Sequence, residues 1–356
     1  MDRLEIPTHE HEARLAALRR TLEAAGFSAM CVFGPVRISY LTGFHFAATE
    51  RPVVLVVPVD ADPHILIPQL EVDHVRQQAR RLEHVRTYPE YPGGGSGKHP
   101  MSHLMDLLAD AGLANASLTA DLDGYEHRWG YRGPRLSQAL GREVATHLEF
   151  VDDLRIVKSP AEVALVREAC VWGDRAHRVM QDLMVEGASE LRVSQEASLT
   201  TTGEMLRELG DRYVPKSREG MPANAMFIRG SNTANPHGLH GNEGLRGGDV
   251  IITGAFGVVG GYESELERTM FFGRPAEACV TYFEAMLAAQ NVALAALRPG
   301  RTCADVEREV SGFIRDELGM GRYLRHHTGH SFGMEGHEHP FLDLDDHTPI
   351  RAGMIL

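Results

Sequence analysis

The most informative stretch of the sequence, residues 325–340, reads Arg-His-His-Thr-Gly-His-Ser-Phe-Gly-Met-Glu-Gly-His-Glu-His-Pro. It concentrates imidazole and carboxylate groups, which ligate metals and transfer protons near neutral pH. Its glycines allow a tightly bent backbone that could turn several of these side chains toward one point. A solvated polar loop is the alternative, but Phe332, Met334 and Phe341 place an apolar residue every few positions. We therefore interpret the stretch as an active-site segment.

Length, charge and composition limit the classes of protein to which this chain can belong. The chain has 356 residues and is 43% hydrophobic, which is enough for two domains with apolar cores. A formal net charge of -13 argues against nucleic acid or an anionic membrane as the main partner. No apolar run reaches the roughly 18–20 residues of a membrane-spanning helix, and Met1–Glu5 lacks the apolar core of a signal peptide. The four cysteines have no paired spacing, which predicts a reducing, cytoplasmic location.

The first half of the chain alternates helical and strand patterns. Apolar residues at helical spacing predict a helix over His9–Ala25 that ends at Gly26. The expected strands are Ala29–Phe33, Pro52–Pro58 and Ile65–Ile67, and the further expected helices are Ile38–Gly43, Leu70–Arg80 and Met101–Ala111. This alternation predicts an α/β domain of roughly 150 residues. The glycine-rich segment at 88–100 lacks the Lys-Ser/Thr ending of a phosphate-binding loop, so nucleotide binding is not expected.

Helix start signals mark the second half of the chain. Ser159 at the cap, Pro160 at the first helical position and Glu162 at the third predict a helix that runs to about Glu186. Three further helices are expected, starting at Ser189, Ala276 and Thr302. The pattern therefore predicts two pairs of consecutive helices.

The two helix pairs belong to a duplicated unit. Aligning Gly187 with Gly300 brings the cap residues of the two second helices onto each other. The segment 246–251 aligns in turn with the segment 351–356, so an apolar strand follows each helix pair. We expect both copies to contribute strands to one sheet. Because the second of these strands would stop soon after it begins, we expect the 356-residue chain to be an inactive fragment.

A segment with three carboxylates lies between the two copies. The strand Asp249–Thr253 leads through a glycine-rich turn into residues 261–269, where Glu263, Glu265 and Glu267 alternate with other residues. On one continuous strand these three side chains lie on one face. Carboxylates are costly to bury without cations, so this face either is solvated or meets imidazoles, guanidinium groups or a metal.

Four motifs occur in a fixed order along the chain. They are Pro236-His237, the Gly-Tyr-x-Ser-acid-x-x-Arg-Thr segment at 261–269, Gly329-His330, and His337-Glu338-His339-Pro340. In this order they resemble the pita-bread hydrolases, the superfamily of aminopeptidase P, prolidase, methionine aminopeptidase and creatinase. The resemblance implies an α/β (α+β) fold. A creatinase-like N-terminal domain at 1–155 would precede a pseudo-two-fold pita-bread catalytic domain at 156–356, incomplete at its C-terminus.

The resemblance also implies roles for individual residues. His237 and His337 correspond to histidines that bind substrate and take part in catalysis, and Glu265 and His330 correspond to metal ligands. Glu267 lies where creatinase has a glutamate that helps to hold its substrate without a metal. It therefore joins His237 and His337 as a candidate catalytic and substrate-binding residue.

Two departures from the family pattern concern the metal. Gly254 stands where the first metal-ligand aspartate is expected, and it has no side chain to coordinate an ion. The family's two later glutamates would follow Gly353-Met354, where this chain ends. Loss of a carboxylate weakens the binding of oxygen-preferring ions such as Mn²⁺. We therefore expect Mn²⁺ or another divalent metal to be bound weakly or not at all, with activity that withstands a chelator.

The resemblance leaves three functions open. The first is hydrolysis of C–N bonds in small peptides, as in an Xaa-Pro dipeptidase or aminopeptidase, with a metal-bridged water. The second is a metal-independent, creatinase-like amidinohydrolase with an amidine or amide substrate. The third is a non-catalytic family member. The family also implies a homodimer, in which the aromatic loop Tyr125–Tyr131 would close over a neighbour's site.

Overall fold

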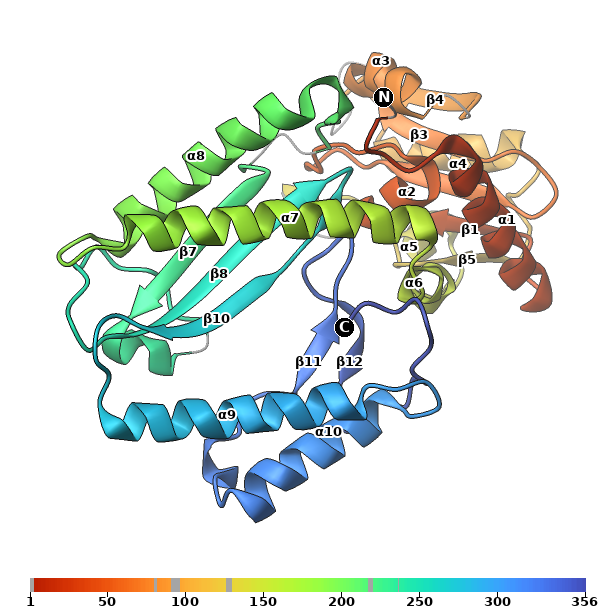
Figure 1. Cartoon of the computed structure of the whole chain (residues 1–356). Coiled ribbons are helices and arrows are strands. Elements are labelled where there is room, and N and C mark those ends of the chain that lie inside the picture. The colour runs from red at the N-terminus through yellow and green to blue at the C-terminus, as the bar shows by residue number, and fades with distance from the viewer. Residues whose placement is uncertain (1–2, 80–81, 91–96, 126–129, 217–219, 236) are drawn as a thin grey trace. The chain divides into compact units, whose positions relative to one another are not determined.

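The computed structural model describes residues 3–79, 82–90, 97–125, 130–216, 220–235 and 237–356 (Figure 1). These residues divide into two compact units, each described by itself below. The first contains residues 6–155 and Lys216, and the second contains residues 3–5, 156–215 and the described residues from 220 onward. Parts of two expected loops, at 88–100 and at Tyr125–Tyr131, lie outside the described residues. Among the described residues, no helix combines the length and apolarity that crossing a bilayer requires.

The first unit is built on one mixed sheet with the strand order β4-β3-β2-β1-β5-β6. The pairs β1–β2 and β2–β3 are antiparallel, and the other neighbouring pairs are parallel. The strands are β1 (Ala29–Val32), β2 (Val54–Pro58), β3 (His64–Pro68), β4 (His84–Tyr88), β5 (Leu118–Ala120) and β6 (Ala145–Thr146). The helices are α1 (Thr8–Ala24), α2 (Pro35–Thr42), α3 (Val72–Gln78), α4 (Pro100–Asp110), α5 (Leu136–Leu140) and α6 (Glu149–Ile156).

The expected elements of this unit are present within a few residues of their expected bounds, but three strands and the helices α5 and α6 are additional. β1, β2 and β3 are almost completely buried, which explains why their apolar runs were readable. In β4 only Tyr88 is buried, and both residues of β6 are exposed. Such half-polar or very short strands have no apolar run to reveal them.

A half-buried histidine connects α1 to α2. His11 Nδ1 lies 3.0 Å from the carbonyl oxygen of Tyr40, and Arg14 Nη1 donates to the same oxygen at 2.8 Å. Gly43 ends α2 with a φ of 75°, and a Cβ at this position would lie 2.9 Å from His11 Nε2. Burial, and next the charge of Arg14, lower the pKa of His11 to about 4. The imidazole is therefore packed as a neutral group.

The second unit begins with two helices that cover one face of an antiparallel sheet. α7 (Pro160–Leu183) and α8 (Glu190–Leu209) pack on the sheet of order β10-β8-β7, with β9 paired to β8 (Figure 1). The strands are β7 (Ala223–Arg229), β8 (Val250–Val259), β9 (Tyr262–Glu263) and β10 (Leu266–Phe271). The core between helices and sheet includes Ala176, Met180, Val193, Ala197, Phe227 and Ala255. The other face of the sheet remains for the polar groups.

The second copy of the repeat follows in the same unit. It consists of α9 (Glu277–Ala296), α10 (Cys303–Gly312) and the hairpin of β11 (Gly329–Ser331) with β12 (Glu338–Leu342). Single helical turns occur at Gln69–Glu71 in the first unit and at Gly210–Arg212, Gly230–Ala234, Phe313–Glu317 and Gly321–Tyr323 in the second. Both copies have the same two backbone contacts beside the cap of their second helix. They are the Ser189–Gly244 bridge with Leu245 N to Ala188 O (2.9 Å), and the Thr302–Pro349 bridge with Ile350 N to Arg301 O (2.8 Å).

Two of the three predicted helix caps of the serine or threonine type, Ser159 and Thr302, close with an acidic partner. Ser159 Oγ accepts from Glu162 N at 3.1 Å, and Glu162 Oε2 accepts from Ser159 N at 2.7 Å. Thr302 and Asp305 form the same reciprocal pair at the start of α10. These bonds satisfy backbone N–H groups that a helix start leaves without an intrahelical partner.

The expectation of one continuous strand over 261–269 is wrong. β9 ends at Glu263 and β10 begins at Leu266. The buried Ser264 accounts for the interruption, because its Oγ accepts from Gly257 N and donates to Ala169 O of α7, both at 3.0 Å. The alternation of side chains survives the break, since the buried Ser264 lies between two half-buried glutamates.

The expectation of a strand in the segment 351–356 is also wrong. The structure has no strand there, and Gly353 adopts a φ of 93°, a left-handed conformation outside the strand region. The carbonyl oxygen of Gly353 accepts from Lys158 N at 2.9 Å, so this segment contacts the residues that precede α7.

A buried ion pair joins the start of α7 to the histidine-rich segment. Lys158 Nζ lies 3.3 Å from Glu338 Oε2, and the two side chains are 1% and 4% exposed. Lys158 Nζ also donates to Ser331 Oγ at 2.9 Å. The other carboxylate oxygen of Glu338 accepts from Met334 N at 2.7 Å and from Glu335 N at 3.1 Å. The turn between β11 and β12 is therefore folded around the Glu338 carboxylate.

The buried pair predicts a large stability cost when the lysine is removed. Lys158→Met takes away the cation while the Glu338 carboxylate stays buried, and breaking a buried pair in this way costs about 3–5 kcal/mol. The double variant Lys158→Met/Glu338→Gln removes the charge but keeps an acceptor, so it is expected to recover part of the loss. Urea unfolding measures both. As a control, Arg175→Met breaks the exposed Arg175–Glu204 pair and is expected to cost less than about 1 kcal/mol. A Lys158→Met protein as stable as the parent contradicts the account.

The lowered pKa of His11 predicts a loss of stability in acid. The unfolded chain takes up a proton near the ordinary pKa of 6.5, whereas the folded unit resists protonation down to about 4. In this window the unfolded state binds more protons, so the free energy of unfolding falls as pH drops. The contribution of His11 reaches about 3 kcal/mol. Urea titrations near neutral pH and near the lowered pKa of about 4 measure the fall in the free energy of unfolding. It is expected to shrink in His11→Gln but not in the exposed control His9→Gln, and equal pH slopes in all three proteins count against it.

Candidate active site

The open face of the sheet in the second unit forms the base of the site. On β8, Gly254 pairs with Glu267 of β10 on one side and with Met226 of β7 on the other. Residues directly opposite each other in a sheet project to the same face, and so does the residue two positions along the strand. The half-buried Met226 and Phe256 therefore share this face with Glu267. The base combines apolar side chains with carboxylates along its β10 edge.

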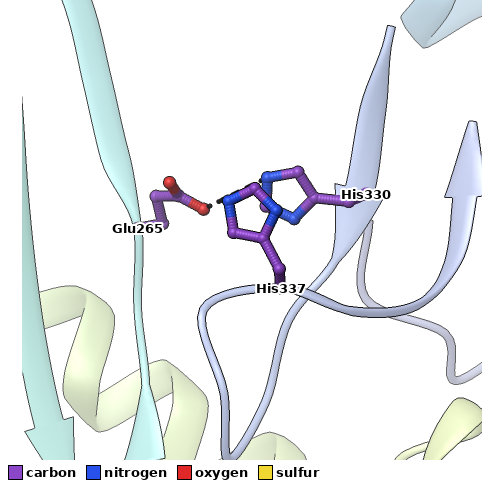
Figure 2. Close-up of side chains that lie close together, drawn as sticks. All are labelled: Glu265, His330 and His337. Atoms are coloured by element: carbon purple, nitrogen blue, oxygen red, sulfur yellow. Dashed lines mark ion pairs between the residues drawn. The ribbon is translucent and has the colours of Figure 1, made fainter. Parts of the chain in front are cut away.

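Three candidate residues from three segments meet above this base. Glu265, His330 and His337 each offer one ligand atom, and these atoms all lie within 4.8 Å of one another (Figure 2). Glu265 lies between β9 and β10, His330 lies on β11, and His337 lies in the turn before β12. His330 Nε2 is 3.7 Å from Glu265 Oε2, and the two imidazole rings stack with centroids 3.8 Å apart and an angle of 17° between their planes. Such a group has the donors of a divalent-metal site.

Hydrogen bonds of neighbouring residues orient this group. The ring nitrogen Nδ1 of His330 lies 3.1 Å from the carbonyl oxygen of Ser331, to which it can only donate. The proton of the neutral ring is thereby placed on Nδ1, and the lone pair of Nε2 faces Glu265. His337 directly precedes Glu338, whose carboxylate is held by Lys158. Each ligand candidate thus follows or precedes a residue that is fixed by buried contacts.

Two carboxyl groups near this site have a raised pKa, and one histidine has a lowered pKa. Partial burial, and next the charge of Glu265, raise the pKa of Glu267, although the residue is exposed to solvent. Burial and the charges of Glu335, Glu338 and Glu265 raise the pKa of Glu263. Burial and the neighbouring His330 lower the pKa of His337. The crowded negative charge therefore favours a bound cation, and His337 holds a neutral imidazole near pH 7.

The structure places His237 and Glu267 around the group rather than in it. Pro236 lies outside the described residues, and His237 is exposed. The charge of His237 acts on Glu267 and on His337, so its loop lies within electrostatic reach of both. Glu190 supports this loop from α8, because its carboxylate accepts from Arg229 N at 2.7 Å and from Gly241 N.

The ring of Phe256, two residues further along β8, lies beside Gly254. A Cβ built on Gly254 would lie 3.1 Å and 3.3 Å from two ring carbons of Phe256. The aromatic ring therefore lies against the place where an aspartate side chain would begin. Sequence reasoning missed this role of Phe256, although its spacing of two from Gly254 on an expected strand was a readable signal. It also missed Lys158, whose partner Glu338 lies far away in the sequence.

A hollow of about 390 Å³ lies beside the group, at the hairpin of β11 and β12. Its volume falls within the range of small-molecule sites. The ring of His327, one of its lining residues, packs edge-on to His330 with centroids 6.4 Å apart. The lining residues are His327, His339, Phe341, Asp343, Asp345, Asp346 and His347.

Comparisons with known proteins agree with this arrangement. The model of metallopeptidase family M24 matches residues 164–356, and that of the creatinase/prolidase N-terminal domain matches residues 14–157. A putative dipeptidase of Bacillus subtilis, YkvY, is 24% identical over 343 residues, covering 96% of this chain and 88% of that protein. An Xaa-Pro dipeptidase of Pyrococcus horikoshii is 27% identical over 208 residues, which are 58% of this chain and 56% of that protein.

The fold has close counterparts among solved structures. The crystal structure of dipeptidase PepE from Mycobacterium ulcerans has a TM-score of 0.81 and 26% identity, covering 98% of this chain and 88% of that chain. The predicted fold, a creatinase-like domain followed by a pita-bread domain, is thereby confirmed. With a family model that matches more than half of its length, around an acid–histidine group of the metal-binding kind, this chain belongs to metallopeptidase family M24.

Proposed function

We propose that this protein hydrolyses small peptides as an Xaa-Pro dipeptidase-like enzyme. The observation that carries the proposal is the meeting of Glu265, His330 and His337, with ligand atoms within 4.8 Å of one another. Membership of a metallopeptidase family supports it, and so do relatives named dipeptidase and Xaa-Pro dipeptidase. An Xaa-Pro dipeptide is small enough for a site bounded by the sheet face and the hairpin turn.

The residues present fit a divalent cation. One carboxylate and two imidazoles offer ligand atoms within 4.8 Å of one another beside further carboxylates, and Glu265 and His330 would be ligands. When bound, such an ion would polarise the scissile carbonyl group and lower the pKa of a water molecule. We propose dependence on a divalent metal, with Mn²⁺ disfavoured by the glycine at position 254, in preference to metal-independent activity.

The chain's own residues would handle the substrate and its protons. His237, in an exposed loop near Glu267 and His337, would donate a proton to the leaving nitrogen. Glu267, at the β10 edge of the sheet face, would receive the positively charged amino group of the substrate. The Phe256 ring would exclude water from the base of the site.

One observation favours a second candidate, a creatinase-like amidinohydrolase. Gly254 removes a metal ligand, and Glu267 lies directly opposite it on the neighbouring strand. A carboxylate beside an aromatic ring is a suitable receptor for a guanidinium-type substrate. Substrate tests separate this candidate from the peptidase.

The remaining features of the proposal concern the whole molecule. We propose residues 1–155 as the creatinase-like domain and 156–356 as the catalytic domain, a cytoplasmic location, and a homodimer. Light scattering at micromolar concentration is expected to give the mass of a dimer, and a monomer mass rules the dimer out.

The peptidase proposal predicts a defined substrate preference. With a divalent ion added, the protein is expected to release proline from Ala-Pro and to leave Pro-Ala and creatine intact. His330→Gln removes a ligand and is expected to lower kcat/KM by about 100-fold or more, equivalent to about 2.7 kcal/mol. His84→Gln, an exposed histidine of the first unit, serves as the control. Liquid chromatography of the products measures both.

Each other outcome of this assay identifies an alternative. Creatine turnover without Xaa-Pro cleavage establishes the amidinohydrolase, and full activity after dialysis against EDTA establishes metal independence. No turnover of either substrate by mass-verified protein favours the expectation of an inactive chain.

A further inference from the structure

We propose that Glu190 is a positioning residue for His237, because its carboxylate binds both ends of the loop that carries this histidine. Glu190 is the first residue of α8 and belongs to none of the four ordered motifs. The proposal deepens the proposed function and rests on it for the role of His237 as a proton donor. It assigns Glu190 no contact with the substrate, so any effect of Glu190 on catalysis must act through the loop.

The carboxylate of Glu190 connects the two ends of the loop. Its Oε1 atom accepts from Arg229 N at 2.7 Å, where β7 ends, and its Oε2 atom accepts from Gly241 N, which follows His237 in the chain. Glu190 is only 3% exposed, so little water reaches the carboxylate to compete for these two N–H groups. Its negative charge is also favourable at the N-terminus of α8. Each oxygen therefore fixes one end of the loop.

The end of the loop at Arg229 has a second anchor. Arg229 Nη1 donates to Glu243 Oε2 and Arg229 Nη2 donates to Asp249 Oδ1, both at 2.9 Å. Asp249 immediately precedes β8, so this anchor belongs to the sheet. Because these charge-assisted bonds hold Arg229 without Glu190, the Gly241 end depends more on the Glu190 carboxylate.

A glycine faces the carboxylate at this end. A Cβ built on Gly241 would lie 2.8 Å from Glu190 Oε2, which is too close unless one of the two groups shifts. Gly241 does not have a positive φ, so the close approach, rather than an unusual backbone conformation, is what requires a glycine here. A methyl group at position 241 is therefore expected to push the carboxylate away from Gly241 N.

Hydrogen bonds inside the loop connect the anchored ends to His237. Asn232 Nδ2 donates to Leu239 O at 2.8 Å, and Gly238 N donates to Asn235 O at 2.9 Å. Each of these bonds joins a residue before His237 to a residue after it. The loop is thus cross-linked around the histidine, and a shift at its ends is expected to move the imidazole.

Steady-state kinetics of Glu190→Gln in two backgrounds test the proposal, with Ala-Pro as substrate and a divalent ion added. Glutamine replaces one acceptor oxygen by an NH₂ group, so one end of the loop loses its bond. We expect kcat to fall about tenfold and KM to change by less than about twofold, because a misplaced proton donor affects the chemical step. In His237→Ala protein the same substitution is expected to change the residual kcat by less than about twofold. Equal losses in both backgrounds overturn the proposal, since Glu190 would then act without His237.

Two glycines of the same connection between β7 and β8 give a matched pair of variants. Gly241→Ala pushes on the Glu190 carboxylate and is expected to reproduce the fall in kcat. Gly247→Ala is the control, because a Cβ at Gly247 meets nothing within 4 Å and Gly247 also lacks a positive φ. It is expected to keep the kcat of the parent, and equal kcat values in the two alanine variants count against the proposal.

Hydrogen exchange measured by mass spectrometry examines the loop without any substrate. Peptides that contain His237 are expected to exchange faster in Glu190→Gln and in Gly241→Ala than in the parent, and at the parent's rate in Gly247→Ala. A protein that shows this difference but cleaves no Xaa-Pro dipeptide refutes the proposed function and leaves the role of Glu190 in the loop intact. Unchanged exchange of these peptides in Glu190→Gln overturns the proposal, whatever the substrate.

Discussion

The buried ion pair between Lys158 and Glu338 is the interaction on which the geometry of the site depends. A carboxylate as buried as that of Glu338 is stable only when a cation and hydrogen-bond donors satisfy it. Lys158 supplies the charge, and two backbone N–H groups of the hairpin turn supply the bonds. Because this turn connects His330 to His337, the separation of the two imidazoles depends on the Lys158–Glu338 ion pair, although neither histidine belongs to it.

The sheet contributes the other half of the site through its simple alternation of side chains. Helices α7 and α8 cover one face with an apolar core, so carboxylates that point to the other face meet the histidines instead of the core. Ser264 holds the irregular link between β9 and β10 and thereby sets the position of Glu265. On the same face, Gly254 offers no side-chain donor, and the ring of Phe256 lies against the place where a side chain would begin. An aromatic ring and the carboxylate of Glu267 therefore share this face of the sheet.

Sequence patterns predicted the features whose causes are local. The cap of α7 was readable because Ser159 and Glu162 lie three residues apart. Glu265 and His330 became ligand candidates through the family resemblance of the ordered motifs, and this role stays a prediction. The pairing of Lys158 with Glu338 joins distant segments and leaves no local signal. The break at Ser264 was missed for the same reason, because its hydrogen-bond partners lie in α7 and β8.

The central claim is that Glu265 and His330, which meet above the open sheet face, take part in binding a divalent ion. Anomalous diffraction from crystals grown with Co²⁺, recorded on both sides of its absorption edge, tests this claim most directly. The account predicts an anomalous peak within bonding distance of Glu265 and His330, at about 2.0–2.2 Å. The absence of a peak beside Glu265 and His330 would contradict it.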